Sequence, residues 1–270
     1  MKRIVAGLAV AAGAALVAPV PVHAAAKVDP VKALREQFEG GKGVEVASLT
    51  KMAIPGGPST TVRESGVIEF GGSAPVASDL TSERSYNSAY LGKLNKDQRE
   101  RAEAERGPVR TISVNSASYV SRAPYPDELP VGKSWVRYEE VPGRSGLVDV
   151  LEPATLKALV SAASSNRDGV IKGTITTAKL AAASPSARRQ FGRGGSAKIA
   201  YTVWLDASGL VERVVAAASP SRYDVTYEAR FRSWGHSVSI FAPSQNDVVR
   251  RSAFDNGGLD QMTLNVEGVN

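Results

Sequence analysis

The last third of the chain contains three segments in which polar and apolar side chains alternate, at residues 197–205, 210–218 and 223–232. Successive side chains of a β-strand point to opposite faces of the sheet, so this period of two predicts strands with one buried face. Turn-forming residues at 206–209 and 219–221 separate the three segments. The pattern therefore predicts an antiparallel meander with one apolar face and one solvated face.

The third segment also predicts an irregularity within its own strand. Its apolar side chains occupy odd-numbered positions, namely Tyr223, Val225, Tyr227, Ala229 and Phe231. The residues that follow continue at even-numbered positions, namely Trp234, His236, Val238 and Ile240. A change of phase of this kind requires a bulge or a bend, which we expect near residues 233–235.

The rest of the chain predicts further strands and a few helices. Strands are expected at residues 44–52, 61–70, 109–114, 118–122, 134–140 and 170–175, where β-forming residues lie between turn signals. The turn at 55–58 joins the first two strands as a hairpin. Helices are expected at 29–38, 152–161 and 177–190, the third being weakened by Pro185 in its middle.

Residues 79–107 break the alternating pattern. They are polar, and residues 95–106 carry charges on every side. This composition predicts a solvated loop or a short exposed helix, with a mobile flap over a pocket as the alternative.

The first 26 residues have the features of a secretory leader. Lys2 and Arg3 precede an apolar stretch at residues 4–20, and small residues follow at Ala24–Ala26. We therefore expect a signal peptide at 1–26, cleavage near Ala24–Ala26, and a secreted protein without a stable membrane anchor. A retained N-terminal anchor is the alternative, but the apolar run is short for a membrane span. Residues 27–270 are then expected to form a single domain.

Composition excludes several kinds of chemistry. The chain has no cysteine, which excludes disulfides, thiol nucleophiles and cysteine-bound zinc. Its two histidines are His23, which lies in the leader, and His236, so zinc sites built on several histidines are excluded as well. Without the leader, 31 basic and 27 acidic residues remain. The positive charge is therefore mild, and the sequence has no stripe of Lys and Arg interleaved with aromatic residues. Both features argue against a nucleic-acid partner.

Paired carboxylates are the remaining route to an enzyme. The closest acidic pairs are Glu139 with Glu140 and Asp149 with Glu152. Neighbouring residues on a strand point to opposite faces, so Glu139 and Glu140 do not form a catalytic pair. We expect no enzyme activity, no metal and no cofactor, and keep a secreted hydrolase as the least favoured alternative.

Apolar surface is what the chain offers in place of catalytic groups. The helix at 153–161 carries an apolar stripe, and the predicted sheet offers alternating apolar and aromatic positions. A one-sided sheet covered by short helices can enclose an apolar cavity. We predict that such a cavity is lined by Leu156, Leu159, Val160, Tyr201, Val203, Tyr227 and Phe231.

Three passages of the chain resemble a known group of proteins. Tyr119-Val120, followed by LPVGKSW at 129–135, resembles the "Y-V … L-P-x-G-K-x-W" passage of actinobacterial secreted lipoproteins. Residues 203–211 are similar to their "W-x-D-x-x-G-L" hairpin, and residues 231–243 to their closing "F-x-x-W-G-x-x-V-x-I-x-x-P" strand. On these passages the chain resembles the LolA/LolB lipoprotein carriers and the mycobacterial LprG/LppX lipoproteins.

This resemblance implies an α+β fold, an antiparallel β half-barrel whose concave face is closed by helices around a lipid-sized cavity. It implies a non-enzymatic protein that binds or carries a hydrophobic ligand such as a lipid acyl chain. Two departures are visible: the lipobox cysteine is replaced within Ala24–Ala26, and residues 92–107 are an apparent insertion. The main rival is a module whose cavity is filled by its own side chains and which binds a protein or polymer of the cell envelope.

Overall fold

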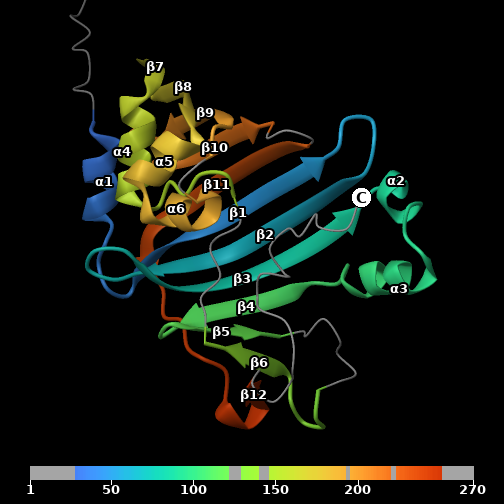
Figure 1. Cartoon of the computed structure of the whole chain (residues 1–270). Coiled ribbons are helices and arrows are strands. Elements are labelled where there is room, and N and C mark those ends of the chain that lie inside the picture. Colours follow the sequence, from blue (N-terminus) through green and yellow to red (C-terminus); the bar gives the residue numbers. More distant parts are fainter. Residues whose placement is uncertain (1–27, 122–128, 140–145, 193–194, 220–222, 251–270) are drawn as a thin grey trace, which may run out of the picture.

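The computed structural model describes residues 28–121, 129–139, 146–192, 195–219 and 223–250, and Figure 1 shows their arrangement. The expected leader at 1–26, with its cleavage site, lies outside these residues. The strands are β1 Lys42–Ala53, β2 Ser59–Phe70, β3 Pro75–Tyr86, β4 Val109–Val114, β5 Ala117–Val120, β6 Trp135–Tyr138, β7 Ala163–Arg167, β8 Val170–Thr176, β9 Lys198–Leu205, β10 Val211–Ala218, β11 Asp224–Ser237 and β12 Val248–Arg250. The helices are α1 Pro30–Glu36, α2 Ser88–Leu91, α3 Lys96–Ala104, α4 Pro153–Ser161, α5 Thr177–Ala183, α6 Pro185–Phe191 and the short 3₁₀ turn η2 Gln245–Asp247.

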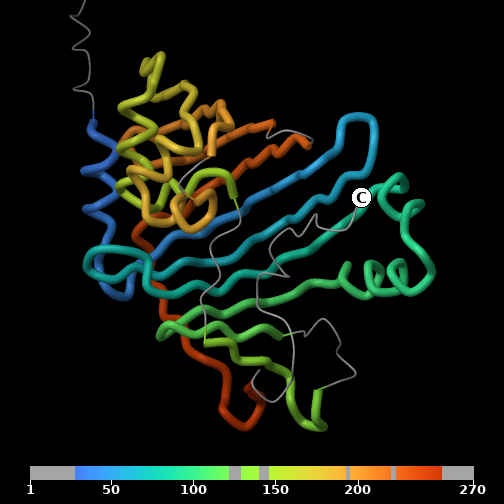
Figure 2. Tube along the Cα trace, viewed as in Figure 1, coloured from blue at the N-terminus to red at the C-terminus, as the bar shows by residue number. Residues whose placement is uncertain are grey.

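All twelve strands belong to one open sheet, in the order β12-β6-β5-β4-β3-β2-β1-β11-β10-β9-β8-β7. Neighbouring strands run antiparallel, except that β12 lies parallel to β6. Among the described residues, the first and last strands in this order are unpaired on one side, so this sheet does not close on itself. Figure 2 follows the chain through this sheet.

Helices cover only part of the sheet. Helices α1, α4, α5 and α6 gather beside the strands β7–β11, whereas α2 and α3 lie at the opposite end (Figure 1). Helix α4 contacts β7 and β8, α5 contacts β8, and α1 packs against α4. We call the face that meets α4 and α5 the inner face and the opposite face the outer face. The expected α+β fold class, an open antiparallel half-barrel with helices on one face, is confirmed.

The strongest sequence predictions are confirmed in the structure. Strands β9, β10 and β11 form the expected meander, and the odd-numbered positions of β11 up to Phe231 are buried. The phase change lies where it was expected: Ser233 and Gly235 have φ of 54° and 73°, and the pairing of β11 with β1 shifts register beside them. The hairpin of β1 and β2 and the helix capped by Asp29 are also present.

Residues 79–86 differ from the expected loop, because they form most of strand β3. Every residue from Asp79 to Tyr86 pairs with β2, so its backbone groups are satisfied in spite of the polar sequence. Leu80 of this strand is buried, whereas Glu83 and Ser85 are exposed. Most of the charged residues 95–106 form the short exposed helix α3, which is one of the structures expected for them.

Two smaller differences concern residues 163–190. The polar segment Ala163–Arg167 is the edge strand β7, which the sequence pattern did not predict. The helix expected at 177–190 is divided at Ser184, whose φ of −122° and ψ of 120° are extended. Pro185 excludes the helical conformation at the preceding residue, and the Ser184 hydroxyl then caps α6 by accepting a bond from the Ala187 N–H.

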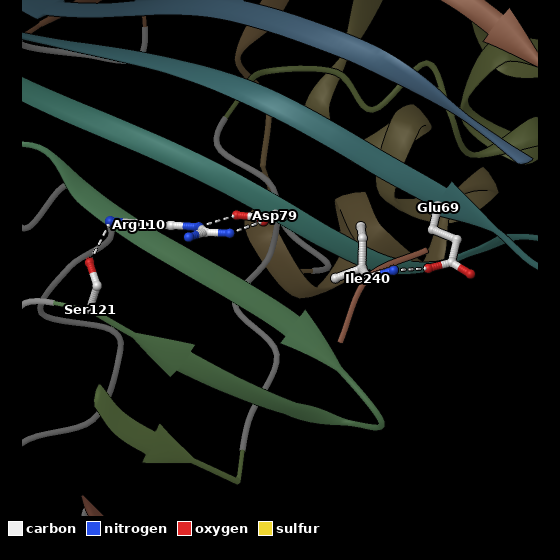
Figure 3. Close-up of polar contacts among 5 residues, drawn as sticks. All are labelled: Glu69, Asp79, Arg110, Ser121 and Ile240. Carbon is white, nitrogen blue, oxygen red and sulfur yellow. Dashed lines mark hydrogen bonds and ion pairs between the residues drawn. The ribbon is translucent and has the colours of Figure 1, made fainter. Parts of the chain in front are cut away.

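The chain leaves the middle of the sheet after β11 and returns at its far edge as β12. On the way, the Val238 N–H donates to the Gly41 carbonyl, and the Ile240 N–H donates to Glu69 Oε2 over 2.8 Å (Figure 3). Nearby on the outer face, Arg110 binds both carboxylate oxygens of Asp79, at 2.8 and 2.6 Å (Figure 3). The first two contacts hold residues 238–240 beside β1 and β2, and the ion pair joins β4 to β3. Within the described residues, no helix is long and apolar enough to span a membrane.

Candidate functional site

The seven predicted cavity residues lie together in the interior. Leu156, Leu159 and Val203 are 0% exposed, so protein atoms surround these side chains on every side. Tyr201, Tyr227 and Phe231 are buried in the same apolar cluster. Val160 is half-buried and packs against the edge of this cluster. The predicted residues therefore do converge, and their space is closed in this conformation.

A hydrogen bond joins helix α4 to the sheet through this cluster. The Tyr201 hydroxyl donates to the Leu159 carbonyl over 2.5 Å. Burial raises the pKa of Tyr201 to about 12, so its phenol keeps the proton that it donates. Gly173 lies opposite Tyr201 on β8, and a Cβ there would come within 2.3 Å of the Tyr201 hydroxyl and 2.9 Å of the Ala162 carbonyl. A residue without a side chain is therefore required beside Tyr201.

A polar cluster connects the helices to one another. Glu152 precedes α4, and its Oε2 accepts hydrogen bonds from the hydroxyls of Thr155 (2.9 Å), Ser184 (2.5 Å) and Ser186. Burial alone would raise the pKa of Glu152, but these three hydroxyls together hold it below its usual value. Because Ser184 also begins α6, the cluster joins α4 to the junction of α5 and α6. We call this the Glu152 clamp.

The inner face becomes polar in the middle of the sheet. The inward positions of β1 are Val44, Val46, Ser48, Thr50 and Met52, as their pairing and burial show. Glu64 of β2 lies opposite Ser48, and Ser82 of β3 lies opposite Glu64. The alternation of residues 44–52 carries a signal for these residues, because it places Ser48 and Thr50 in phase with three apolar side chains. The predicted site did not include them.

A hollow lies on the surface, beside the bulge in β11. It has a volume of about 550 Å³ and is lined by Gln37, Asp206, Ser208, Leu210, Glu212, Phe231, Arg232, Ser233 and Trp234. Trp234 forms one wall: its Nε1 donates to the Val211 carbonyl over 3.1 Å, and its ring stacks on Phe70. Residues 203–211 and 231–243, which carry two of the resemblance passages, therefore meet at this place. Of their Trp and Gly positions, Trp234 and Gly235 lie at the bulge.

The candidate catalytic groups are engaged in structural contacts. His236 is partly exposed, and its Nδ1 lies 2.6 Å from the Ser233 carbonyl. Glu139 pairs with Arg137, and Asp149 accepts from the Leu151 N–H. Glu140 lies outside the described residues. In the described part of the chain, no group of three or more His, Asp or Glu side chains is arranged to hold a metal ion.

Two of the three tryptophans belong to the outer face. Arg213 lies over the ring of Trp204 at 4.7 Å, and Arg110 lies over the ring of Trp135 at 5.8 Å. Cation–π contacts of this kind stabilise a solvated surface. Trp234 is thus the tryptophan that packs against the interior cluster.

Comparison with known proteins gives distant structural likenesses. No family model matches the chain, and no curated protein sequence matches it. Among solved structures, the chain is similar to lipoprotein LppX of Mycobacterium tuberculosis, with a TM-score of 0.38 and 14% identity over 78% of this chain and 96% of that one. It is also similar to a LolA superfamily protein of Nitrosomonas europaea, with a TM-score of 0.31 and 8% identity over 76% of this chain and 92% of that one.

A third likeness is to lipovitellin, a structure concerned with lipid–protein interactions. The TM-score is 0.25 and the identity 9%, over 76% of this chain and 27% of that one. The first two of these proteins belong to the groups that the sequence passages resemble, and both likenesses are distant. We transfer no residue role from likenesses this distant.

Proposed function

We propose that this protein is exported and binds an apolar ligand, such as a lipid acyl chain, between the helices α4–α6 and the inner face of the sheet. The observation that carries this proposal is the contrast between two kinds of contact. The helices α4, α5 and α6 are joined to one another by the polar Glu152 clamp. In contrast, α4 contacts the sheet through apolar side chains and through the hydrogen bond from Tyr201 to Leu159. Such a layer can open away from the sheet while the chain keeps α4 joined to β7 and α5 joined to β8.

The energetics of such a movement favour an apolar ligand. Separating α4 from the sheet would expose apolar surface such as Leu156 and Leu159, at a cost of about 25 cal/mol per Å². An acyl chain placed in the gap would cover the same surface and offset that cost. Water in the gap would not offset the cost, because exposing apolar groups to water is the unfavourable step itself. The proposal assigns binding to this site and no catalysis, cofactor or metal.

The closed interior supports a second candidate function. Because Leu156, Leu159 and Val203 are 0% exposed, the interior can also be read as a filled core. The protein would then act through its surface, as a module that binds a protein or polymer of the cell envelope. Such a partner would bind at the hollow beside Trp234.

Native mass spectrometry of the secreted protein from its own host, with lipid extraction, tests the first proposal directly. We expect a co-purified ligand, and we expect the purified protein to bind a fluorophore-labelled fatty acid. Leu159→Trp should abolish this binding, whereas Leu49→Trp, on the outer face, should leave it unchanged. A protein that carries no extractable ligand and binds no labelled fatty acid would support the filled-core alternative.

A further inference from the structure

We propose that the ligand carries a neutral ester, and that Ser48 and Thr50 bind its oxygen atoms on the inner face of β1. This inference rests on the proposed function and names the class of ligand. The juxtaposition that carries it is two buried hydroxyl groups, two residues apart on the inner face of one strand, that have no hydrogen-bond partner among the described residues.

The two hydroxyls stand on the same face of the central strand β1. Thr50 is only 2% exposed, and both Ser48 Oγ and Thr50 Oγ1 are buried. Neither atom has a hydrogen-bond partner within the described part of the chain. Residues i and i+2 of a strand are about 7 Å apart and point the same way. The two groups therefore form one local site.

Such a pair is unusual in a folded protein. Buried polar groups nearly always have a hydrogen-bond partner, because leaving one unpaired costs free energy. Alanine or valine at these positions would continue the apolar pattern of Val44, Val46 and Met52. Two hydroxyls in that pattern without a partner among the described residues are therefore available to bind a ligand.

The surroundings indicate which chemical class this partner has. Apolar residues stand on both sides of the hydroxyls along β1, with Val46 before them and Met52 after them. Across the sheet, Thr50 lies between Tyr227 and Val62, and Ser48 lies between Ala229 and Glu64. A ligand that fits has a polar centre flanked by apolar chains. A hydroxyl donates to a carbonyl oxygen, and a neutral ester is far less costly to bury than a charged head group.

Two probes and a set of variants test the inference. The probes are a pyrene-labelled diacylglycerol and a pyrene-labelled alkane of equal chain length. The variant is Ser48→Ala with Thr50→Val, and each single change is also measured. The matched control is Ser65→Ala with Thr61→Val, which removes the same groups from the outer face of β2. Thr50→Ser keeps a hydroxyl and serves as the rescue.

We expect the inward variant to bind the ester probe more weakly, by about 5-fold for each hydroxyl removed. Binding of the alkane probe should not change, and the melting temperature should stay equal or rise. Thr50→Ser and the outer-face control should bind both probes like the natural protein.

Three outcomes would overturn the inference. If the natural protein binds the two probes equally well, apolar binding stands but the ester site does not. If the inward variant loses both probes together, the hydroxyls have only a structural role. If the natural protein binds neither probe, the proposed function fails and the inference fails with it.

Discussion

The hydroxyl of Tyr201 donates a hydrogen bond to the carbonyl of Leu159, 2.5 Å away, and so joins the sheet to the helix that covers it. The bond crosses the apolar cluster at the point where the predicted cavity residues converge. It is a polar contact within an interface that is otherwise built from apolar side chains of α4 and the sheet. We infer that it governs how readily the helices separate from the sheet.

Tyr201→Phe should therefore loosen the helix layer without changing the fold. The change leaves the Leu159 carbonyl without this donor, and we expect the free energy of unfolding to fall by about 1–2 kcal/mol. Hydrogen exchange of the α4 amides should rise more than that of β9. The control is Tyr223→Phe, at the half-buried start of β11. Unchanged exchange in α4 would show that the bond does not hold the helix.

Gly173→Ala should destabilise the same region by another route. A Cβ at this position would lie 2.3 Å from the Tyr201 hydroxyl, and the Ala162 carbonyl at 2.9 Å is backbone that cannot move freely. We expect a loss of about 1–3 kcal/mol, measured by urea denaturation. Gly57→Ala, in the turn between β1 and β2, has ordinary contacts and is the control. Equal melting of the two variants would contradict the proposed close packing.

The Glu152 clamp should make stability depend on acid pH. Hydrogen bonds lower the pKa of Glu152 below its unfolded value, so the carboxylate form stabilises the fold. That contribution is present above the unfolded pKa of about 4.3 and is lost as the pH falls through the lower, folded pKa. Glu152→Gln should cost about 1–2 kcal/mol at pH 7 and progressively less below about pH 4.

Denaturant titrations at several pH values measure this difference. Glu36→Gln removes a carboxylate from an exposed ion pair with Lys32 and should have little effect at any pH. A constant difference between the natural protein and Glu152→Gln from pH 7 to pH 3 would contradict the role of the ionised carboxylate.

Trp234→Ala should damage folding. The ring stacks on Phe70, packs against Phe231, and its Nε1 binds the Val211 carbonyl across the bulge. Loss of a large packed side chain typically costs about 3–5 kcal/mol, and we expect the lower end because Trp234 is only half-buried. Thermal melting should show a much smaller effect for Trp204→Ala on the outer face. Equal melting of the two would mean that Trp234 does not support the bulge.

Cleavage of the leader during export should give the protein a defined N-terminus. The leader has a charged start, an apolar centre and small residues at its end, so the secreted protein should begin at Ala25 or Lys27. N-terminal sequencing of protein from the culture medium measures this. A secreted protein that begins at Met1, or one recovered only with detergent, would contradict cleavage.

Periodicity determined the parts of the fold in which one strand face is buried and the other is solvated. The meander of β9, β10 and β11, the phase change near Ser233 and the convergence of Leu159, Tyr201 and Tyr227 on one face could all be predicted, because burial imposes a period of two on the side chains. The apolar stripe of α4 could be predicted for the same kind of reason, with the period of a helix.

Contacts between distant residues decided the rest. The polar residues 79–86 and 163–167 are strands because β2 and β8 supply their hydrogen-bond partners, which no local pattern records. The closed contact between Leu159 and the sheet depends on the register of α4 against β8 and β9, and the Glu152 clamp depends on a serine 32 residues away in the chain. The unpaired state of Thr50 is likewise visible only once its neighbours are in place. A sequence shows which side chains seek burial, whereas the partners that they meet there are set by tertiary packing.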